Sequence, residues 1–259
     1  MKLFTDSIAL FFIVGIRYFV VSGAFYLYFY HWRKSQWIHR KIYPSFPRSE
    51  QMKKEIAWSM GTTFFFAVIG AVFYWAFENG YTQLYLEVAP YGWCYLPISL
   101  GLVLFLHDAY FYVIHRLMHH RWFFVKFHKI HHESRDPSPF ASFSFHPLES
   151  FLEAIVVPAL ACLVPLHWTV YLIFLLIMTI SGVVNHLGFE IFPRNANRHW
   201  LLKWLINPTH HELHHLRVHG NYGLYFTWWD KIFKTESPQY SSTFDEVTYR
   251  ESPAWSQSH

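Results

Sequence analysis

The chain has 259 residues, of which 53% are hydrophobic, 22% are aromatic and only 15% are charged. Soluble domains carry about 25% charged residues, so this composition excludes an ordinary soluble protein. The net charge of +4 is weakly basic and indicates no nucleic-acid partner. Cys94 and Cys162 lie singly in apolar runs, which excludes a disulfide framework and a CxxC zinc motif.

Apolar segments that could span a bilayer begin close to the N-terminus. A membrane-spanning helix needs about 20 mostly apolar residues. Three segments meet this length and a fourth is long enough for two short passes: residues 8–30, 58–77, 93–114 and 152–184. Pro165 would interrupt a helix in the fourth segment, so we expect a helical hairpin there. The first segment lacks a small-residue cleavage site and should remain in the mature protein.

The loops between these segments differ in charge. Residues 31–55 hold seven Lys and Arg side chains, whereas residues 78–91 hold none. The positive-inside rule therefore places residues 31–55 in the cytoplasm. Counting spans from there puts residues 115–150 and 185–259 on the same side. We expect a multi-pass protein of a bacterial inner membrane or of the endoplasmic reticulum.

Three histidine clusters lie on this predicted cytoplasmic side: HRLMHH at 115–120, HKIHH at 128–132 and HELHH at 211–215. Residues i, i+3 and i+4 of a helix share one face, so each HxxHH unit lines one side of a helix. Its two adjacent histidines are about 100° apart around the axis, so each leans toward a different ion. Two facing units would clasp a dinuclear centre. The pair His115 and His119 would form a third wall and give one ligand to each ion.

Further candidates lie near these clusters. Asp108 falls on nearly the same helix face as the first cluster, and we expect it to accept a hydrogen bond from the outer ring nitrogen of a metal-bound histidine. His186 sits at the edge of an apolar span, where an imidazole is expensive unless it is used. Glu190 follows it by four residues. His107 and His146 neighbour the stronger candidates and are possible additional ligands.

The number and type of these ligands bear on the metal. Imidazole sites suit zinc, copper, iron or nickel. Zinc sites take about four ligands. Nine or more histidines give each of two ions about five, which is closer to the preference of iron. Two irons beside a bilayer suggest that dioxygen is activated to attack an unreactive C–H bond of a lipid.

Two other functions fit parts of the pattern. His211, Glu212 and His215 match the HExxH motif of zinc proteases, with Glu212 as the general base. That interpretation leaves His214 and the HKIHH cluster unexplained. A non-enzymatic metal carrier or transporter is the other alternative. Transporter sites usually lie near the bilayer midplane, whereas these clusters lie at the cytoplasmic end.

The motifs HDAYFYVIHRLMHH, FHKIHHES, SFHPLE, NHLGFEIFP, THHELHH and GNYGLYFTWWDKIFKT together resemble the fatty acid hydroxylase superfamily. Within it, the chain is most similar to the sterol desaturase and C4-methyl sterol oxidase branch. The resemblance covers about residues 100–236. Residues 1–99 would then form the N-terminal spans and the basic loop, and residues 237–259 a loose polar tail.

The resemblance implies a membrane-bound, non-haem diiron enzyme that uses O2. Electrons would come from a separate reductase, ferredoxin or cytochrome b5-type donor. The reaction would be hydroxylation or desaturation of a lipid, and the residues leave sterol, fatty acyl and carotenoid substrates open. The implied fold is an all-α membrane protein of about four transmembrane or hairpin helices, with a cytoplasmic helical cap that holds the dinuclear site.

Nine histidines match metal ligands of the family by position: His115, His119, His128, His131, His132, His186, His211, His214 and His215. Some members carry a further histidine four residues after the one that matches His186. This chain has Glu190 there. The remaining ligand position is therefore left to Glu190, His146 or His107.

Overall fold

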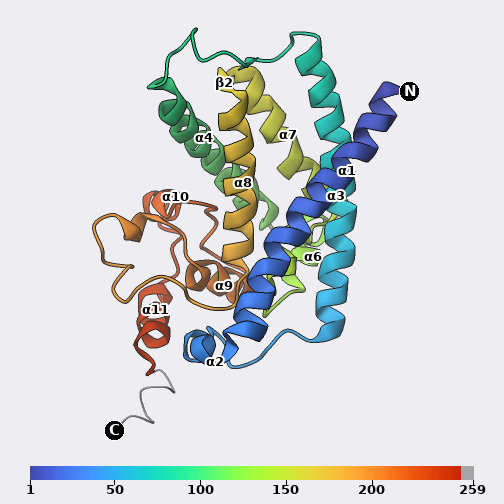
Figure 1. Cartoon of the computed structure of the whole chain (residues 1–259). Coiled ribbons are helices and arrows are strands. Elements are labelled where there is room, and N and C mark those ends of the chain that lie inside the picture. The colour runs from blue at the N-terminus through green and yellow to red at the C-terminus, as the bar shows by residue number, and fades with distance from the viewer. Residues whose placement is uncertain (252–259) are drawn as a thin grey trace.

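The computed structural model describes residues 1–251, and their regular secondary structure is helical apart from two short strands (Figure 1). The N-terminal half comprises α1 (Lys2–Tyr26) with its π-helical extension η1 (Leu27–Trp32), α2 (Lys34–Trp37), η2 (Ile38–Arg40), α3 (Ser49–Glu78), β1 (Leu84–Tyr85) and α4 (Tyr95–Met118). The rest comprises α5 (Phe124–Phe127), α6 (Lys129–His132), η3 (Pro139–Phe143), α7 (Pro147–Leu163), β2 (Leu166–His167), α8 (Trp168–Asn185), η4 (Leu202–Trp204), α9 (Pro208–Arg217), α10 (Trp228–Ile232) and α11 (Tyr240–Tyr249).

Four of these helices are long and apolar enough to cross a membrane: Lys2–Trp32, Ser49–Glu78, Tyr95–Met118 and Trp168–Asn185. The first two contain the predicted segments 8–30 and 58–77, and the third begins two residues later than the predicted segment 93–114. The fourth predicted segment, 152–184, is divided between two helices. Its first limb, α7, has 17 residues, and the chain then turns through an extended Val164 into β2 and α8. The predicted hairpin is therefore present. The side of the membrane on which each loop lies stays a prediction.

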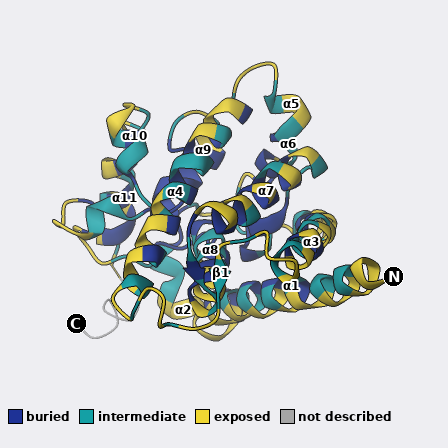
Figure 2. Cartoon of the chain, turned by 90° about the horizontal axis from the view of Figure 1, so that it is seen from above, coloured by how far each residue is buried: buried dark blue, intermediate teal, exposed yellow. Residues whose placement is uncertain are grey.

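The long helices pack side by side and carry apolar side chains on their outer faces. In Figure 1, α7 lies between α8 and the pair α1 and α3. Exposed residues follow α1 along its length in Figure 2. They include Phe12, Ile16 and Val20, each about 60% exposed. A helix whose outer face is this apolar suits a lipid environment.

The short helix η3 packs against the long helices and precedes α7. It contacts α1, α3 and α8. Within it, Phe143 stacks on Tyr18 of α1 with ring centroids 5.3 Å apart and meets Phe66 of α3 edge-on at the same separation. Tyr18 also donates a hydrogen bond to the backbone carbonyl of Phe140. The segment that follows η3 is therefore held against the bundle.

The end of the chain differs from the predicted loose tail. Residues Tyr240–Tyr249 form α11, and it packs on α9. Tyr240, Phe244 and Val247 are buried, and their spacing of four and three residues places them on one helix face. The segment was predicted to be a loose tail because its composition is mostly polar, and that composition hides this apolar stripe. Residues 252–259 lie outside the described part of the chain, and the division of the chain at residues 99 and 236 stays a prediction.

Candidate metal centre

The HELHH cluster lies on α9, whose start is defined by local sequence. Asn207 is the N-cap, and its side chain accepts a hydrogen bond from the backbone N–H of His210. Pro208 occupies the first helical position, where its missing N–H costs nothing. The helix ends at Val218, which adopts a left-handed conformation. These signals limit α9 to ten residues. Its histidines face His119 at the end of α4 and His186 at the end of α8.

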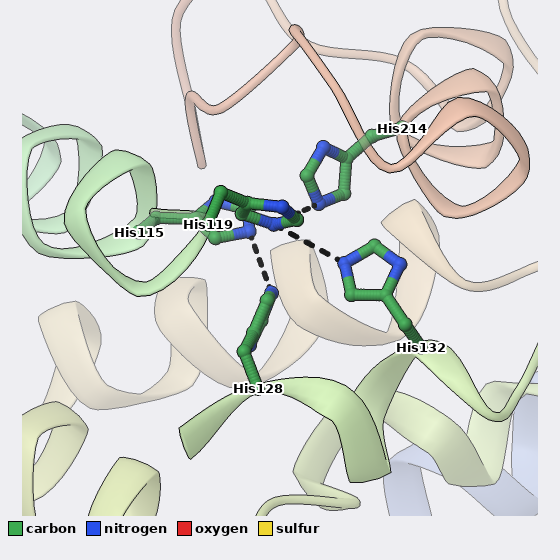
Figure 3. A group of neighbouring side chains, drawn as sticks. All are labelled: His115, His119, His128, His132 and His214. Carbon is green, nitrogen blue, oxygen red and sulfur yellow. Dashed lines mark hydrogen bonds between the residues drawn. The ribbon is translucent and has the colours of Figure 1, made fainter. Parts of the chain in front are cut away.

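The other two clusters approach from the opposite side. His115 lies in the last turn of α4, and His119 is the residue that caps it. His128 precedes the single-turn helix α6, which carries the adjacent pair His131 and His132. Figure 3 shows imidazole rings from these elements and from α9 pointing toward a common centre.

The ring nitrogens form two separate groups. Within each group, one nitrogen per residue lies within 4.8 Å of every other. The first group is His115, His119, His128, His132 and His214. The second group is His131, His186, His211 and His215. The structure thus brings together all nine histidines that the sequence singles out, and whether they bind metal stays a prediction.

The division between the groups follows helix geometry. His131 and His132 point into different groups, as do His214 and His215. The expectation that His115 and His119 would be divided is wrong, because both lie in the first group. Residues four apart share a helix face, so a pair at this spacing points to one ion and not to two.

The outer ring nitrogens of the second group identify which nitrogen faces inward. His186 Nδ1 lies 2.7 Å from the carbonyl oxygen of Gly182, and His131 Nδ1 lies 3.3 Å from that of Ser144. A carbonyl oxygen only accepts, so both Nδ1 atoms must carry the proton. The Nε2 atoms of these two rings are then bare, and they lie 3.2 Å apart.

Two bare nitrogens at this distance repel each other unless a cation lies between them. Nε2 of His186 is equally close to Nε2 of His211 and of His215, at 3.1 Å each. Ligand atoms about 2.1 Å from one metal ion are roughly 3.0–3.4 Å apart at octahedral or tetrahedral angles. The described residues of the second group therefore fit a bound metal ion.

The first group has the same construction with one difference. His115 Nδ1 donates to the carbonyl of Tyr222 at 2.9 Å, and His214 Nδ1 donates to that of Gly220 at 2.7 Å. His128 Nδ1 instead lies 2.6 Å from a carboxylate oxygen of Glu149. The Nε2 atoms of His115 and His128 are 2.9 Å apart. A metal ion fits this group by the same reasoning.

Burial keeps these rings in the form that binds metal. Burial, followed by the charge of neighbouring histidines, lowers the pKa of His132 to about 3. Burial also lowers the pKa of His186 to about 4. The pKa values of His131 and His211 are lowered well below the usual range for the same reasons. Neutral imidazole is the metal ligand, so the centre is prepared for metal at neutral pH.

Four other predicted residues lie outside both groups. Asp108 accepts hydrogen bonds from the backbone N–H groups of Leu224 and Tyr225, and no candidate ligand donates to it. Leu224 and Tyr225 belong to the same loop as Tyr222, whose backbone carbonyl contacts His115. Asp108 therefore supports the candidate metal centre only through this loop. The predicted contact between Asp108 and a histidine ring is therefore wrong.

The three possible additional ligands are engaged elsewhere. His107 Nδ1 bonds the hydroxyl of Tyr225, and His146 caps α7. The carboxylate of Glu190 accepts hydrogen bonds from Thr209 and from the backbone N–H of Phe192. None of the three belongs to either group. The two groups found among residues 1–251 contain nine histidines, and whether a tenth ligand exists stays a prediction.

Glu149 is the functional residue that sequence reasoning missed. It is 1% exposed and contacts His128 directly. One signal was available, because Glu149 and Glu153 stand four residues apart in an otherwise apolar helix. Carboxyl groups on one face of such a helix are expensive to bury unless they have a partner or a function.

Removing the Glu149 carboxyl should weaken metal binding by the first group. Outer partners of metal-bound histidines are typically worth 10–100-fold in metal affinity. We expect Glu149→Ala to lose about that much, measured by chelator competition on purified protein. Glu149→Gln keeps an oxygen that accepts from His128 Nδ1 and should lose less. Equal, wild-type affinity in both variants would show that the contact does not support the centre.

Comparison with known proteins agrees with the chemistry of these groups. The sequence profile described as "Fatty acid hydroxylase" matches residues 100–235. Lathosterol oxidase of Homo sapiens is 32% identical over 217 residues, which is 81% of this chain and 70% of that protein. A Delta(7)-sterol 5(6)-desaturase of Gibberella zeae is 31% identical over 215 residues, which is 83% of this chain and 63% of that protein.

A more distant relative extends the same pattern. The Delta(7)-sterol-C5(6)-desaturase of Nicotiana tabacum is 25% identical over 231 residues, which is 86% of this chain and 80% of that protein. The chain therefore spans between 63% and 80% of the length of these relatives. No solved structure matches it.

Proposed function

The chain belongs to the fatty acid hydroxylase family, in its sterol desaturase branch, and on this premise we propose that it is a non-haem diiron oxygenase of a membrane lipid. The observation that carries the proposal is the arrangement of nine histidines, eight of them buried and His119 half-buried, as one group of five and one group of four. Such a pair of imidazole groups suits two transition-metal ions. The adjacent membrane helices give a lipid access to the site.

The residues of the centre have separable tasks. The backbone carbonyls of Gly182 and Gly220 hold the rings of His186 and His214 in the tautomer that presents Nε2 inward. The burial of the centre excludes water, which would otherwise compete with the lipid. When bound, two iron ions would supply the redox chemistry that activates O2 toward a C–H bond.

The relatives favour one reaction over the others. Their names specify sterols and, in the Delta(7)-sterol desaturases, formation of a 5(6) double bond. We propose that this chain likewise removes two hydrogens from a sterol. The balance requires one O2, two electrons and two protons, and it releases two water molecules. The electrons come from a separate donor protein, and the metal centre lies on the cytoplasmic side of the membrane.

Sterol analysis tests this proposal. Cells that express the protein should contain sterols two mass units lighter than those of cells with the His131→Ala variant. Incorporation of one oxygen atom instead would indicate hydroxylation. A change confined to acyl chains, or no change in any lipid, would contradict the sterol substrate.

Glu212 separates the oxygenase from the zinc protease. Its carboxylate is fully buried, belongs to neither group, and has no hydrogen-bonding partner among residues 1–251. Burial raises the pKa of Glu212 well above its ordinary value, which disfavours the ionised form that a general base needs. We expect Glu212→Gln to retain most of the lipid-oxidising activity. Near-complete inactivation with both metals still bound would favour the protease.

A further inference from the structure

A cavity of about 270 Å³ lies between α1, α3, α7 and α8. Most of its lining is apolar, and each helix contributes to it: for example, Leu10 of α1, Phe73 of α3, Val157 of α7 and Leu175 of α8. Three of these helices, α1, α3 and α8, are long and apolar enough to span a membrane. The fourth, α7, forms the predicted hairpin with α8. An apolar lining of this kind suits part of the hydrocarbon body of a lipid.

Two ionisable side chains interrupt the apolar lining. Arg17 of α1 and Glu153 of α7 both line the cavity. Neither makes a hydrogen bond or an ion pair within residues 1–251, and Arg17 Nε is buried without a partner. Ionisable groups at this depth are expensive and usually mark a binding or transport site. Their lack of protein partners leaves both free to bind a polar group of a ligand.

The end of the cavity at Glu153 lies toward the histidine groups, although no histidine lines it. Glu153 lies one helical turn beyond Glu149, and side chains at this spacing are about 5–6 Å apart. The carboxylate of Glu149 contacts His128 of the first group. On the other side, Phe66 lines the cavity and packs on Phe143. The next residue, Ser144, holds His131 of the second group. The cavity therefore approaches both histidine groups.

The polar group that enters this end meets the carboxyl group of Glu153. A hydroxyl group can donate a hydrogen bond to a carboxyl oxygen, and a protonated carboxyl group can donate one to the hydroxyl oxygen. A lipid carboxylate or phosphate carries a full charge, which is expensive to bury in a lining that is apolar apart from Arg17 and Glu153. The cavity is too apolar elsewhere to satisfy a large polar head group.

We propose that this cavity binds a lipid alcohol, with its hydroxyl held by Glu153 and its hydrocarbon body extending away from the metal centre. The assignment rests on the proposed function, since it names the binding site for that reaction. It places the C–H bonds within a few bonds of the hydroxyl nearest the histidine groups. Oxidation should therefore occur in the part of the lipid that carries the hydroxyl and not at the far end of its hydrocarbon.

Binding can be measured without turnover. Purified protein in nanodiscs, kept under nitrogen without reductant, is titrated with radiolabelled lathosterol and with the analogue that lacks its hydroxyl. A hydrogen bond between a hydroxyl and a carboxyl group corresponds to about tenfold in affinity. We expect the wild type to prefer the alcohol by this factor. In Glu153→Met the preference should disappear, while the deoxy analogue still binds.

A second pair of variants tests the cavity itself. A Cβ atom at Gly70 of α3 would lie 3.3 Å from Leu10 Cδ1 in the cavity wall, whereas one at Gly61 of the same helix meets open space. Gly70→Leu should weaken binding of both lipids by about tenfold or more, by occupying the cavity. Gly61→Leu makes the same chemical change outside the cavity and should bind as the wild type does. Both variants should retain the metal content of the wild type, which confirms folding.

Three outcomes would overturn the proposal. Wild-type binding by Gly70→Leu would place the lipid elsewhere. An unchanged preference for the alcohol in Glu153→Met would assign the hydroxyl to another residue. Tighter binding of oleate than of lathosterol, lost in Arg17→Met, would indicate a carboxylate lipid instead. Because no oxidation is measured, any of these results leaves the proposed oxygenase activity to be judged by the sterol analysis alone.

Discussion

Replacing His186 with alanine is expected to abolish turnover and to remove one of two metal ions. Nε2 of His186 lies 3.1–3.2 Å from the matching atoms of His131, His211 and His215, so it is the common member of the second group. Loss of an outer partner alone costs 10–100-fold in metal affinity. Loss of the ligand itself should cost more than this. Turnover should fall by at least about a hundredfold, measured as sterol product per mole of protein.

His39→Ala is the control for this variant. His39 lies in η2 and belongs to neither group, so its removal should leave metal content and turnover near wild type. The first group does not include His186 and should keep its metal in the His186→Ala variant. A His186→Ala protein with two bound metals and substantial turnover would show that the second group does not hold a catalytic ion.

Asp230→Ala should produce the largest loss of stability. Asp230 is fully buried, and its carboxylate accepts hydrogen bonds from the backbone N–H groups of Tyr222 and Gly223 and from the Thr235 hydroxyl. Alanine would leave these buried donors without partners, at a cost of about 3–5 kcal/mol. For a protein of this size, the midpoint of thermal unfolding should fall by roughly 10 °C. Metal content should fall as well, because the carbonyl of Tyr222 holds His115.

Asp245→Ala removes the same side chain from a half-exposed surface site. Asp245 pairs with Arg198, whose side chain is 57% exposed, and accepts a hydrogen bond from Asn197. Surface ion pairs contribute about 0–1 kcal/mol, so the midpoint should change by no more than a few degrees. Equal shifts in the two variants would mean that the buried carboxylate does not organise the loop beside the metal centre.

The sequence predicted those features that depend on local periodicity. The spacing His-x-x-His-His specifies directions around a helix axis. His131 and His132 accordingly point into different groups, although α6 is only one turn long. The hairpin at Pro165 could be predicted for the same reason, because the length of the apolar run and the position of a helix breaker are both local properties of the sequence. Such features require no knowledge of which elements meet.

The features that sequence reasoning missed depend on contacts between distant segments. Asp108 was placed on the correct helix, but its partners lie more than a hundred residues away, in a loop whose path no local rule specifies. Glu149 contacts His128 only because α7 passes beside α5, which ends directly before His128. The amphipathic spacing in α11 was present in the sequence, but its ten residues include few large apolar side chains. A local pattern thus predicts direction, and tertiary packing decides the partner.

Counting the metal ions tests the central claim most directly. The protein would be purified, loaded anaerobically with ferrous iron and freed of excess metal. Iron and zinc would then be measured together by plasma mass spectrometry against protein concentration from amino-acid analysis. Two groups of five and four histidines predict a ratio of two ions per chain in the wild type and one in the His186→Ala variant. A ratio of one in the wild type, or an identical ratio in both proteins, would contradict the dinuclear centre.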